Sequence, residues 1–187
     1  RSVIDDLAGL HVSTRERAPH LADFHARILS EIGEPRSILD IGCGYHPLTF
    51  SYPKSLLRYV ALEKDVETCE SIEVFAPAAL PTELVTVCGS FIETDFPALL
   101  PQGDSRFDVV FLFKLVPVIA RSDPNALQVL ADLPVDLFVL TASMEAMTRT
   151  QDVSRREDRV LRAFIEQTGR TQVERFEIGN ELGYFVR

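Results

Sequence analysis

The sequence is poor in the residues that mark several large classes of protein. It has no tryptophan, only three cysteines, and no apolar run that approaches the length of a membrane-spanning helix. Cys43, Cys69 and Cys88 cannot all pair and lack metal-ligand spacing, which fits a reducing cytosol and predicts no metal site. The opening residues, Arg1 to Asp6, are polar and unlike a secretory signal peptide. We therefore expect a cytoplasmic protein with no membrane association.

Positive charge is also in short supply. The 187 residues include 19 Lys and Arg against 28 Asp and Glu, a net charge of -9. This balance argues against broad, non-specific binding of nucleic acid, which depends on neutralising phosphates, but it leaves room for a local basic patch. Candidate basic residues form an early and a late group: Arg15, Arg17 and Arg27, then Arg149, Arg155, Arg156, Arg159 and Arg162. For the late group we favour a solvated helix face paired with neighbouring acids.

The pattern of apolar residues predicts strands that alternate with helices in one α/β domain. Strands are expected at 36–41, 58–63, 83–88, 107–113, 135–140, 173–178 and 181–186. Helices are expected at 15–32, 65–76, 92–100, 123–131 and 153–168, with a short broken helix around Pro47 and Pro53. This order predicts a doubly wound, mostly parallel seven-stranded sheet, closed by an antiparallel hairpin whose turn is Gly179-Asn180.

A glycine loop follows the first expected strand. The stretch Ser37-Ile-Leu-Asp-Ile-Gly-Cys-Gly-Tyr45 places a carboxylate, Asp40, near the strand end and two glycines, Gly42 and Gly44, directly after it. Glycines at this position allow a tight turn and a close approach of a nucleotide-like cofactor to the backbone. The dinucleotide fingerprint needs a third glycine where Pro47 stands, so an NAD site is excluded.

A second carboxylate ends the next expected strand. Glu63 lies 19 residues after Gly44, the spacing at which an acid accepts hydrogen bonds from both ribose hydroxyls. Two glycines alone also fit an ordinary tight turn. Strand, acid and glycine loop followed by strand and acid favour a cofactor site.

The acid followed by Gly-Cys-Gly resembles the cofactor loop of class I S-adenosylmethionine-dependent methyltransferases. More narrowly, the chain resembles the aminoglycoside-resistance 16S ribosomal RNA methyltransferases that modify guanine at N7. Four stretches carry this resemblance: Ser13-Thr-Arg-Glu-Arg17 with Pro19, Asp40 to Leu48, Phe113-Lys-Leu-Val-Pro117 with Arg121, and Gly179-Asn-Glu-Leu182 with Tyr184-Phe185. The resemblance implies a Rossmann-like methyltransferase fold, S-adenosyl-L-methionine as cofactor and small-subunit ribosomal RNA as partner. We expect a monomer.

The resemblance also implies roles for individual residues. Arg17 would hold the methionine carboxylate, and Glu63 would take the ribose hydroxyls. Asp40 would order the loop and meet the amino group directly or through water. Two segments after strands three and four would flank the adenine and the methyl group. Without the resemblance, Arg17 would be an exposed helix arginine, and Lys114 fits a substrate phosphate or a surface lysine equally. Cys43 is expected to be a packed residue and not a nucleophile. The complete expected cofactor set is Arg17, Asp40, Gly42, Cys43, Gly44, Glu63, Lys64, Ser90, Phe91, Phe113, Lys114 and Leu115.

Three features depart from the family pattern. Residues 1–34 are expected to be a helical extension, a remnant of the family's larger ribosome-docking domain that is missing or cut away here, ahead of a cofactor domain at 35–187. The segment Thr141 to Met147 lacks the family's proline and glycines near the target base. Gly89-Ser90 stands where an acid near the adenine is expected, and a serine replaces a carboxylate only in part.

Guanine N7 carries a free lone pair and no proton, so its methylation needs no general base. We therefore nominate no catalytic acid or base. An O- or C-methylating enzyme would need one, and His46 beside the glycine loop is the candidate, although a loop-packing role is favoured. Two alternatives remain open: a small-molecule methyltransferase and a catalytically silent, methyltransferase-like binding module.

Overall fold

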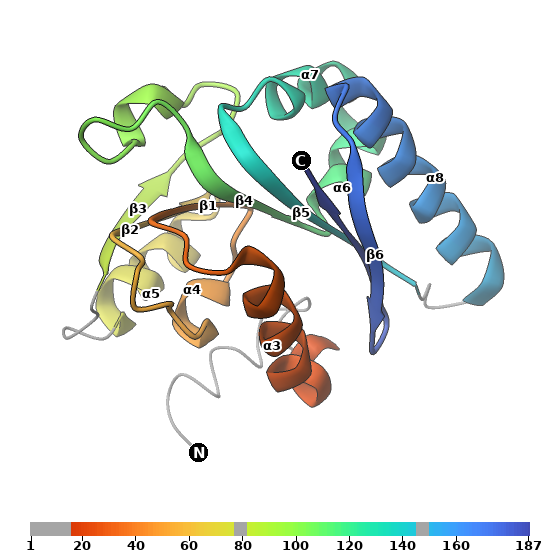
Figure 1. Cartoon of the computed structure of the whole chain (residues 1–187), viewed down its shortest axis with the longest axis horizontal. Helices are drawn as coiled ribbons and strands as arrows, with labels where there is room; N and C mark the ends of the chain where they lie inside the picture. Colours follow the sequence, from red (N-terminus) through yellow and green to blue (C-terminus); the bar gives the residue numbers. More distant parts are fainter. Residues whose placement is uncertain (1–15, 77–81, 145–149) are drawn as a thin grey trace.

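The computed structural model describes residues 16–76, 82–144 and 150–187, which form one seven-stranded sheet with helices on both faces (Figure 1). The strand order is β3-β2-β1-β4-β5-β7-β6, in which β7 runs antiparallel to β5 and β6. The strands are β1 Ser37–Ile41, β2 Arg58–Glu63, β3 Glu83–Cys88, β4 Phe107–Phe113, β5 Val135–Ser143, β6 Gln172–Ile178 and β7 Glu181–Val186. The predicted fold class, including the C-terminal antiparallel hairpin, is confirmed.

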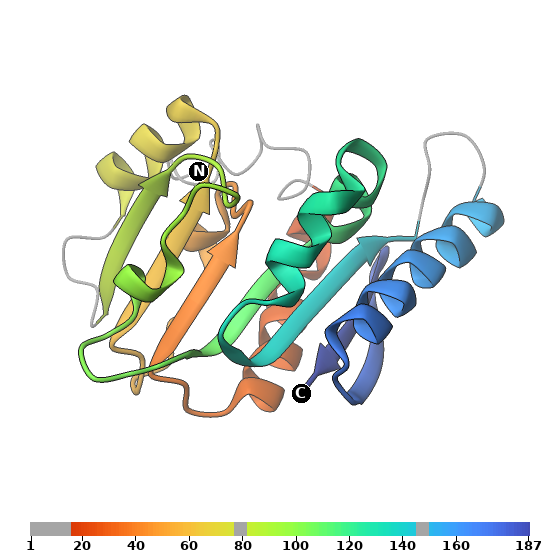
Figure 2. The same ribbon diagram turned by 90° about the horizontal axis from the view of Figure 1, so that it is seen from above.

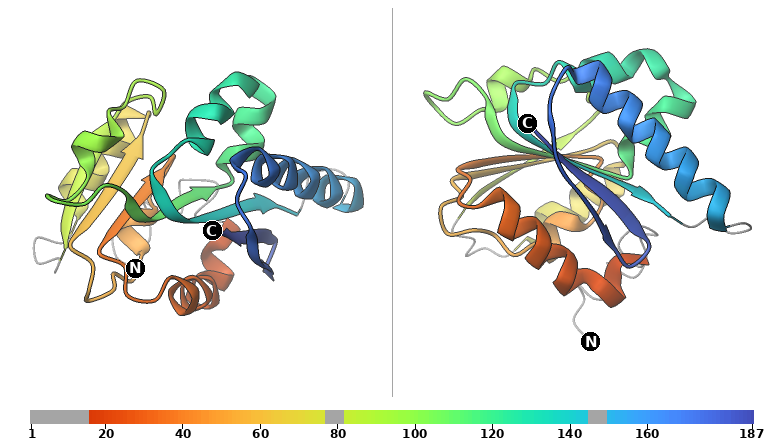
Figure 3. Two further views of the ribbon diagram at one scale, coloured as in Figure 1. Left: turned by 45° about the horizontal axis from the view of Figure 1, so that its top comes forward. Right: turned by 45° about the vertical axis from the view of Figure 1, so that its right-hand side comes forward.

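The helices divide between the two faces, as Figures 2 and 3 also show. One face carries η1 Ala18–His20, α3 Leu21–Ile32, α4 His46–Thr49 and α5 Val66–Phe75. The other carries α6 Leu115–Ser122, α7 Leu127–Ala131 and α8 Thr150–Thr168, and two further short helices are η2 Phe96–Leu99 and η3 Pro124–Ala126. No helix of the described ranges is long and apolar enough to cross a membrane.

The central strands are apolar on both sides because each side faces a separate core. Along β1, Ile38 belongs to the core under α3, α4 and α5, whereas Leu39 belongs to the core under α6, α7 and α8. Along β4, Phe111 and Val110 divide between the same two cores. Successive side chains of a strand point to opposite faces, so a strand covered on both faces becomes a continuous apolar run.

The main error of the sequence prediction is α6, for which no helix was expected. The chain turns from β4 into α6 at Lys114, whose φ of 59° lies in the left-handed region that few residues other than glycine adopt. Pro117 reads as a helix breaker, yet it lies in the first turn, where a missing N–H leaves no hydrogen bond unmade. Neither feature identifies a helix from the sequence alone.

Several element boundaries also differ. The helix predicted at 123–131 is divided into η3 and α7, and the one at 92–100 shrinks to η2. Strand β5 continues three residues beyond the predicted end, and α8 begins at Thr150 and not at 153. The helix predicted from 15 has a 3-10 turn at Ala18–His20, where Pro19 occupies the start.

The C-terminal hairpin depends on close packing at one glycine. A Cβ added to Gly183 of β7 would lie 2.2 Å from Cζ of Phe176 in β6, closer than any normal contact. We expect Gly183→Ala to lower the free energy of unfolding by about 1–3 kcal/mol, measured by urea denaturation, because the ring must leave its packed position.

The matched control adds the same methyl group at Gly89, where no atom lies within 4 Å of the new Cβ. Gly89→Ala should leave stability nearly unchanged. Equal stability of the two variants would contradict this account of the hairpin.

Candidate functional site

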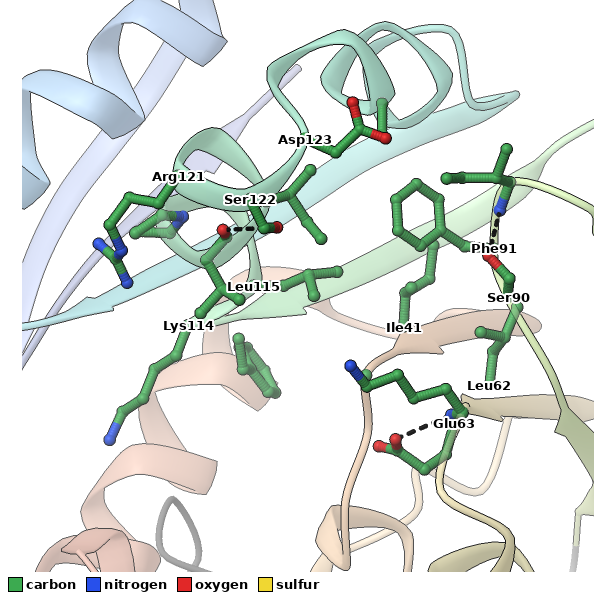
Figure 4. A pocket seen from close by; sticks show the side chains of 18 of the residues that line it. Ile41, Leu62, Glu63, Ser90, Phe91, Lys114, Leu115, Arg121, Ser122 and Asp123 are labelled. Atoms are coloured by element: carbon green, nitrogen blue, oxygen red, sulfur yellow. Dashed lines mark hydrogen bonds between the residues drawn. The ribbon is translucent and has the colours of Figure 1, made fainter.

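A cavity of about 790 Å³ opens at the carboxyl ends of β1, β2, β3 and β4, where α6 begins (Figure 4). The strand order reverses here, because β1 continues to β2 on one side and lies beside β4 on the other. Open α/β sheets bind ligands at this reversal, outside the carboxyl ends of the strands. The cavity is therefore the candidate site.

Most of the predicted cofactor residues line this cavity. Eight do so: Gly42, Glu63, Lys64, Ser90, Phe91, Phe113, Lys114 and Leu115. The remaining four, Arg17, Asp40, Cys43 and Gly44, are not among the residues that line it.

Glu63 is the most firmly held polar group on the cavity wall. One carboxylate oxygen accepts from the N–H of Gly44 at 3.0 Å, and the other accepts from the N–H groups of Lys64 at 2.8 Å and Asp65 at 3.2 Å. These three backbone donors satisfy the loop and hold the carboxylate in place at the end of β2. Such a carboxylate is a fixed acceptor for ligand hydroxyl groups.

Gly42 brings the loop against the opposite wall of the cavity. Its φ of 67° lies in the left-handed region, and an added Cβ would lie 3.3 Å from Cδ1 of Leu115. Its N–H donates to the carbonyl oxygen of Leu62 at 2.8 Å, which closes the turn after β1. The backbone conformation favours glycine at this position, and an added methyl group would crowd Leu115.

Asp40 faces the aromatic core and not the cavity. Its Oδ2 accepts from the hydroxyl of Tyr59 at 2.6 Å and lies 2.8 Å from Nδ1 of His46. His46 is buried against Phe111 and Phe113 and does not line the cavity. The favoured loop-packing role for this histidine agrees with its position, and the geometry makes Asp40 an organiser of the loop.

Cys43 is also packed away from the cavity. Its side chain is buried, and burial, reinforced by the charges of Asp40 and Glu63, raises the pKa of the thiol well above its ordinary value. A protonated, buried thiol is a poor nucleophile. The thiol therefore acts as a small core group, as the sequence predicts.

Arg17 forms a buried ion pair with a residue of the last strand, far away in the sequence. Its Nε and a terminal nitrogen donate to the two carboxylate oxygens of Glu181 at 2.8 and 2.9 Å. The guanidinium also lies over the ring of Phe24, 4.2 Å from its centroid. The family resemblance implies that Arg17 holds a ligand carboxylate, and here the carboxylate of Glu181 in β7 occupies the guanidinium group.

Lys114 belongs to the same network. Its ammonium group lies 2.7 Å from a carboxylate oxygen of Glu16 and 3.5 Å from one of Glu181, and 13% of its side chain is exposed. Lys114 is thus neither a surface lysine nor an unpaired cation, because two carboxylates neutralise it. Burial alone would raise the pKa of Glu181, but Arg17 and Lys114 outweigh burial and hold it below its usual value.

The sequence indicates the α6 and α8 side of the cavity only in part, because it predicts Leu115 as a cofactor residue but not the helix α6 that carries it. Val118, Arg121 and Asp123 line this side, together with Arg156 and Glu157 of α8. Glu157 is buried and accepts from Arg121 at 3.0 Å and from Arg156 at 2.8 Å. The apolar spacing of 115–119 was the available signal for this helix.

The late arginines behave mostly as a solvated helix face. Arg156 pairs with Glu157, Arg162 pairs with Asp158, and Arg155 and Arg159 are exposed. Arg149 lies outside the described residues. Within the described ranges, no group of three His, Cys, Asp or Glu is placed to hold a metal ion.

A family model and the curated relatives of the chain indicate one family. A family model described as "Ribosomal RNA methyltransferase (FmrO)" matches residues 2–184. A 16S rRNA (guanine(1405)-N(7))-methyltransferase of Micromonospora echinospora is 26% identical over 190 residues, which cover 100% of this chain and 66% of the relative. The enzyme of the same description from Proteus mirabilis is 25% identical, over 96% of this chain and 63% of the relative. The chain thus spans somewhat less than two thirds of the length of these relatives.

Solved structures share the fold. The 16S rRNA methylase ArmA superposes with a TM-score of 0.79 at 24% identity, covering 99% of this chain and 90% of the other. The 16S rRNA methyltransferase RmtF, solved in complex with S-adenosyl-L-homocysteine, gives a TM-score of 0.73 at 22% identity, over 100% and 68% of the two chains. At this identity the likeness establishes the architecture alone.

The stability that the Arg17–Glu181 pair contributes should depend on pH in the acid range. Because the pKa of Glu181 is lower in the folded state than the ordinary value of 4.5, its charge stabilises the fold above that pH. We expect Glu181→Gln to cost about 3–5 kcal/mol at neutral pH, since two cations lose their buried partner. As pH falls below 4.5, toward the lower folded pKa, the difference between wild type and variant should shrink.

The measurement is urea unfolding of both proteins between pH 3 and pH 7. Glu177→Gln is the matched control, because Glu177 is half exposed and pairs with Arg175 at the surface. A cost at Glu181 that stays constant across the pH range would contradict the assignment.

Proposed function

Because the chain belongs to the ribosomal RNA methyltransferase (FmrO) family, we propose that it transfers a methyl group from S-adenosyl-L-methionine to guanine N7 of small-subunit ribosomal RNA. The observation that carries the proposal is the fixed carboxylate of Glu63, set beside apolar walls at the strand-order reversal. The cofactor, when bound, supplies a methyl group on a positively charged sulfur.

The residues present fit this cofactor. Glu63 would accept hydrogen bonds from the ribose hydroxyls, as an acid at the end of the second strand does in nucleotide-binding folds. The apolar side chains of Phe91 and Leu115 would contact the two faces of the adenine, and Gly42 would allow close approach of the ligand. The cavity volume lies within the range of sites for ligands of this size.

Arg17 remains a predicted partner for the methionine carboxylate, with one condition. Its guanidinium is already engaged by Glu181 through two hydrogen bonds. A ligand carboxylate would have to share or displace that partner. We propose that Arg17 acts at this site mainly by keeping Glu181 and Lys114 in place beside the cavity.

Methyl transfer to guanine N7 requires alignment and no proton transfer. The chain would therefore act by holding N7 in line with the bond between methyl and sulfur, which lowers the entropic part of the barrier. The α6 and α8 side of the cavity, with Arg121 and Arg156, is the proposed place for the acceptor. We propose residues 35–187 as the cofactor domain and residues 1–34 as the extension that contributes to docking on the small subunit, with the protein acting as a monomer in the cytoplasm.

The scarcity of unpaired positive charge favours a small-molecule acceptor. The net charge is -9, Lys114 is neutralised by two carboxylates, and Arg121 shares Glu157 with Arg156. RNA binding depends on positive surface, whereas a small acceptor does not. The choice of acceptor is therefore tested separately from cofactor binding.

Cofactor binding is tested at Glu63. Titration calorimetry with S-adenosylhomocysteine should show that Glu63→Gln weakens binding by about tenfold to a hundredfold, because charge-assisted hydrogen bonds to the ribose become neutral ones. Glu83→Gln is the control, since Glu83 is exposed, pairs with Arg58 and lies outside the cavity. Equal affinity of Glu63→Gln and wild type would favour a catalytically silent relative.

The acceptor is tested with purified small ribosomal subunits, and in parallel with a panel of metabolites, using a labelled methyl donor. We expect label on guanine in ribosomal RNA, and at least tenfold less label with Glu63→Gln at donor concentrations below saturation. Label found only in small molecules would overturn the RNA proposal and leave the methyltransferase proposal in place.

A further inference from the structure

Two carboxylates lie at opposite sides of the cavity. Figure 4 shows Glu63 at the end of β2 and Asp123 at the end of α6, with Phe91 and Leu115 among the side chains between them. Asp123 is the residue between α6 and η3, and its backbone N–H donates to the carbonyl oxygen of Ile119 at 2.8 Å. This backbone hydrogen bond holds the residue in place, and no side-chain interaction with the described residues does so.

The carboxylate of Asp123 differs from the other carboxylates of the cavity wall. Glu16 pairs with Lys114, Glu157 pairs with two arginines, and Glu63 accepts from three backbone N–H groups. Asp123 makes no side-chain hydrogen bond or ion pair with any residue of 16–76, 82–144 or 150–187. It alone among the lining carboxylates of those ranges keeps its full capacity to accept hydrogen bonds.

The wall between the two carboxylates is suited to a flat, apolar ring. Ile41, Leu62, Phe91 and Leu115 line it, and these side chains offer no hydrogen bonds. An adenosine group has ribose hydroxyls at one end, a flat ring in the middle and an amino group at the far end. The cavity presents a fixed acceptor, an apolar wall and a free acceptor in the same order.

We propose that Asp123 accepts a hydrogen bond from the exocyclic amino group of the cofactor's adenine and makes the site selective for that group. The inference rests on the proposed cofactor. A carboxylate only accepts hydrogen bonds, so it favours an amino group over hydrogen at this position. The segment after β3, Gly89-Ser90, offers no carboxylate, and the hydroxyl of Ser90 already accepts from the N–H of Ile92 at 3.3 Å. Asp123 supplies the acceptor from across the cavity.

The test compares two ligands on two proteins by titration calorimetry. The ligands are S-adenosylhomocysteine and its analogue in which hydrogen replaces the 6-amino group of the adenine. Wild type should bind the amino ligand about tenfold to a hundredfold more tightly than the analogue, as expected for a hydrogen bond to a charged group. Asp123→Ala should bind the two ligands equally, with the loss confined to the amino ligand.

Glu93→Ala controls for the removal of a negative charge near the cavity. Glu93 is exposed, follows β3 and does not line the cavity, so this variant should keep the wild-type preference. A full preference retained by Asp123→Ala, an equal loss in Glu93→Ala, or no preference in wild type would each overturn the assignment. In those cases binding of S-adenosylhomocysteine by wild type would leave the proposed function standing, whereas no binding by folded wild type would overturn both.

Discussion

The hydrogen bonds between the Glu63 carboxylate and three backbone N–H groups connect the parts of the site to one another. They join the glycine loop after β1, through Gly44, to the start of α5, through Lys64 and Asp65. The backbone groups of a buried loop need partners, and a carboxylate with two oxygens supplies several at once. The same bonds that satisfy the loop also fix the acceptor that would meet a ribose.

A second interaction determines what the site can offer to an acceptor. The Arg17–Glu181–Lys114 network joins the first described residues, the end of β4 and the last strand, which are far apart in the sequence. The network has little exposure, so these charges depend on one another and not on solvent. It also neutralises Lys114, so that among the described residues that line the cavity the other cations are Lys64 and the two arginines that share Glu157.

The parts of the fold that could be predicted are those specified by residues close together in the sequence. The run Ile38 to Ile41 with two following glycines specifies a buried strand and a tight turn, and Glu63 ends an equally apolar strand. Gly179-Asn180 between two alternating segments specifies the hairpin, and Gly179 adopts the positive φ of 58° that its turn requires. These features depend on local geometry, which residue type largely determines.

The features that could not be predicted depend on tertiary contacts or on an unusual backbone conformation. Lys114 adopts a left-handed conformation with no local signature, so the sequence does not predict α6, although it does predict the cavity-lining Leu115 at its start. The partner of Arg17 lies 164 residues away, and nothing in the residues around Arg17 indicates Glu181. The contacts of Asp40 with Tyr59 and His46 are likewise tertiary, and nothing in the residues around Asp40 indicates them.

In the proposed complex, one cavity, between Glu63 and α6, holds the adenosine group of the cofactor. The most direct measurement is a crystal structure of the chain with S-adenosylhomocysteine. We expect the ribose hydroxyls within hydrogen-bond distance of the Glu63 carboxylate. The adenine should lie between Phe91 and Leu115, with its amino group toward Asp123. A ligand bound elsewhere, or bound here with the ribose away from Glu63, would contradict this proposal.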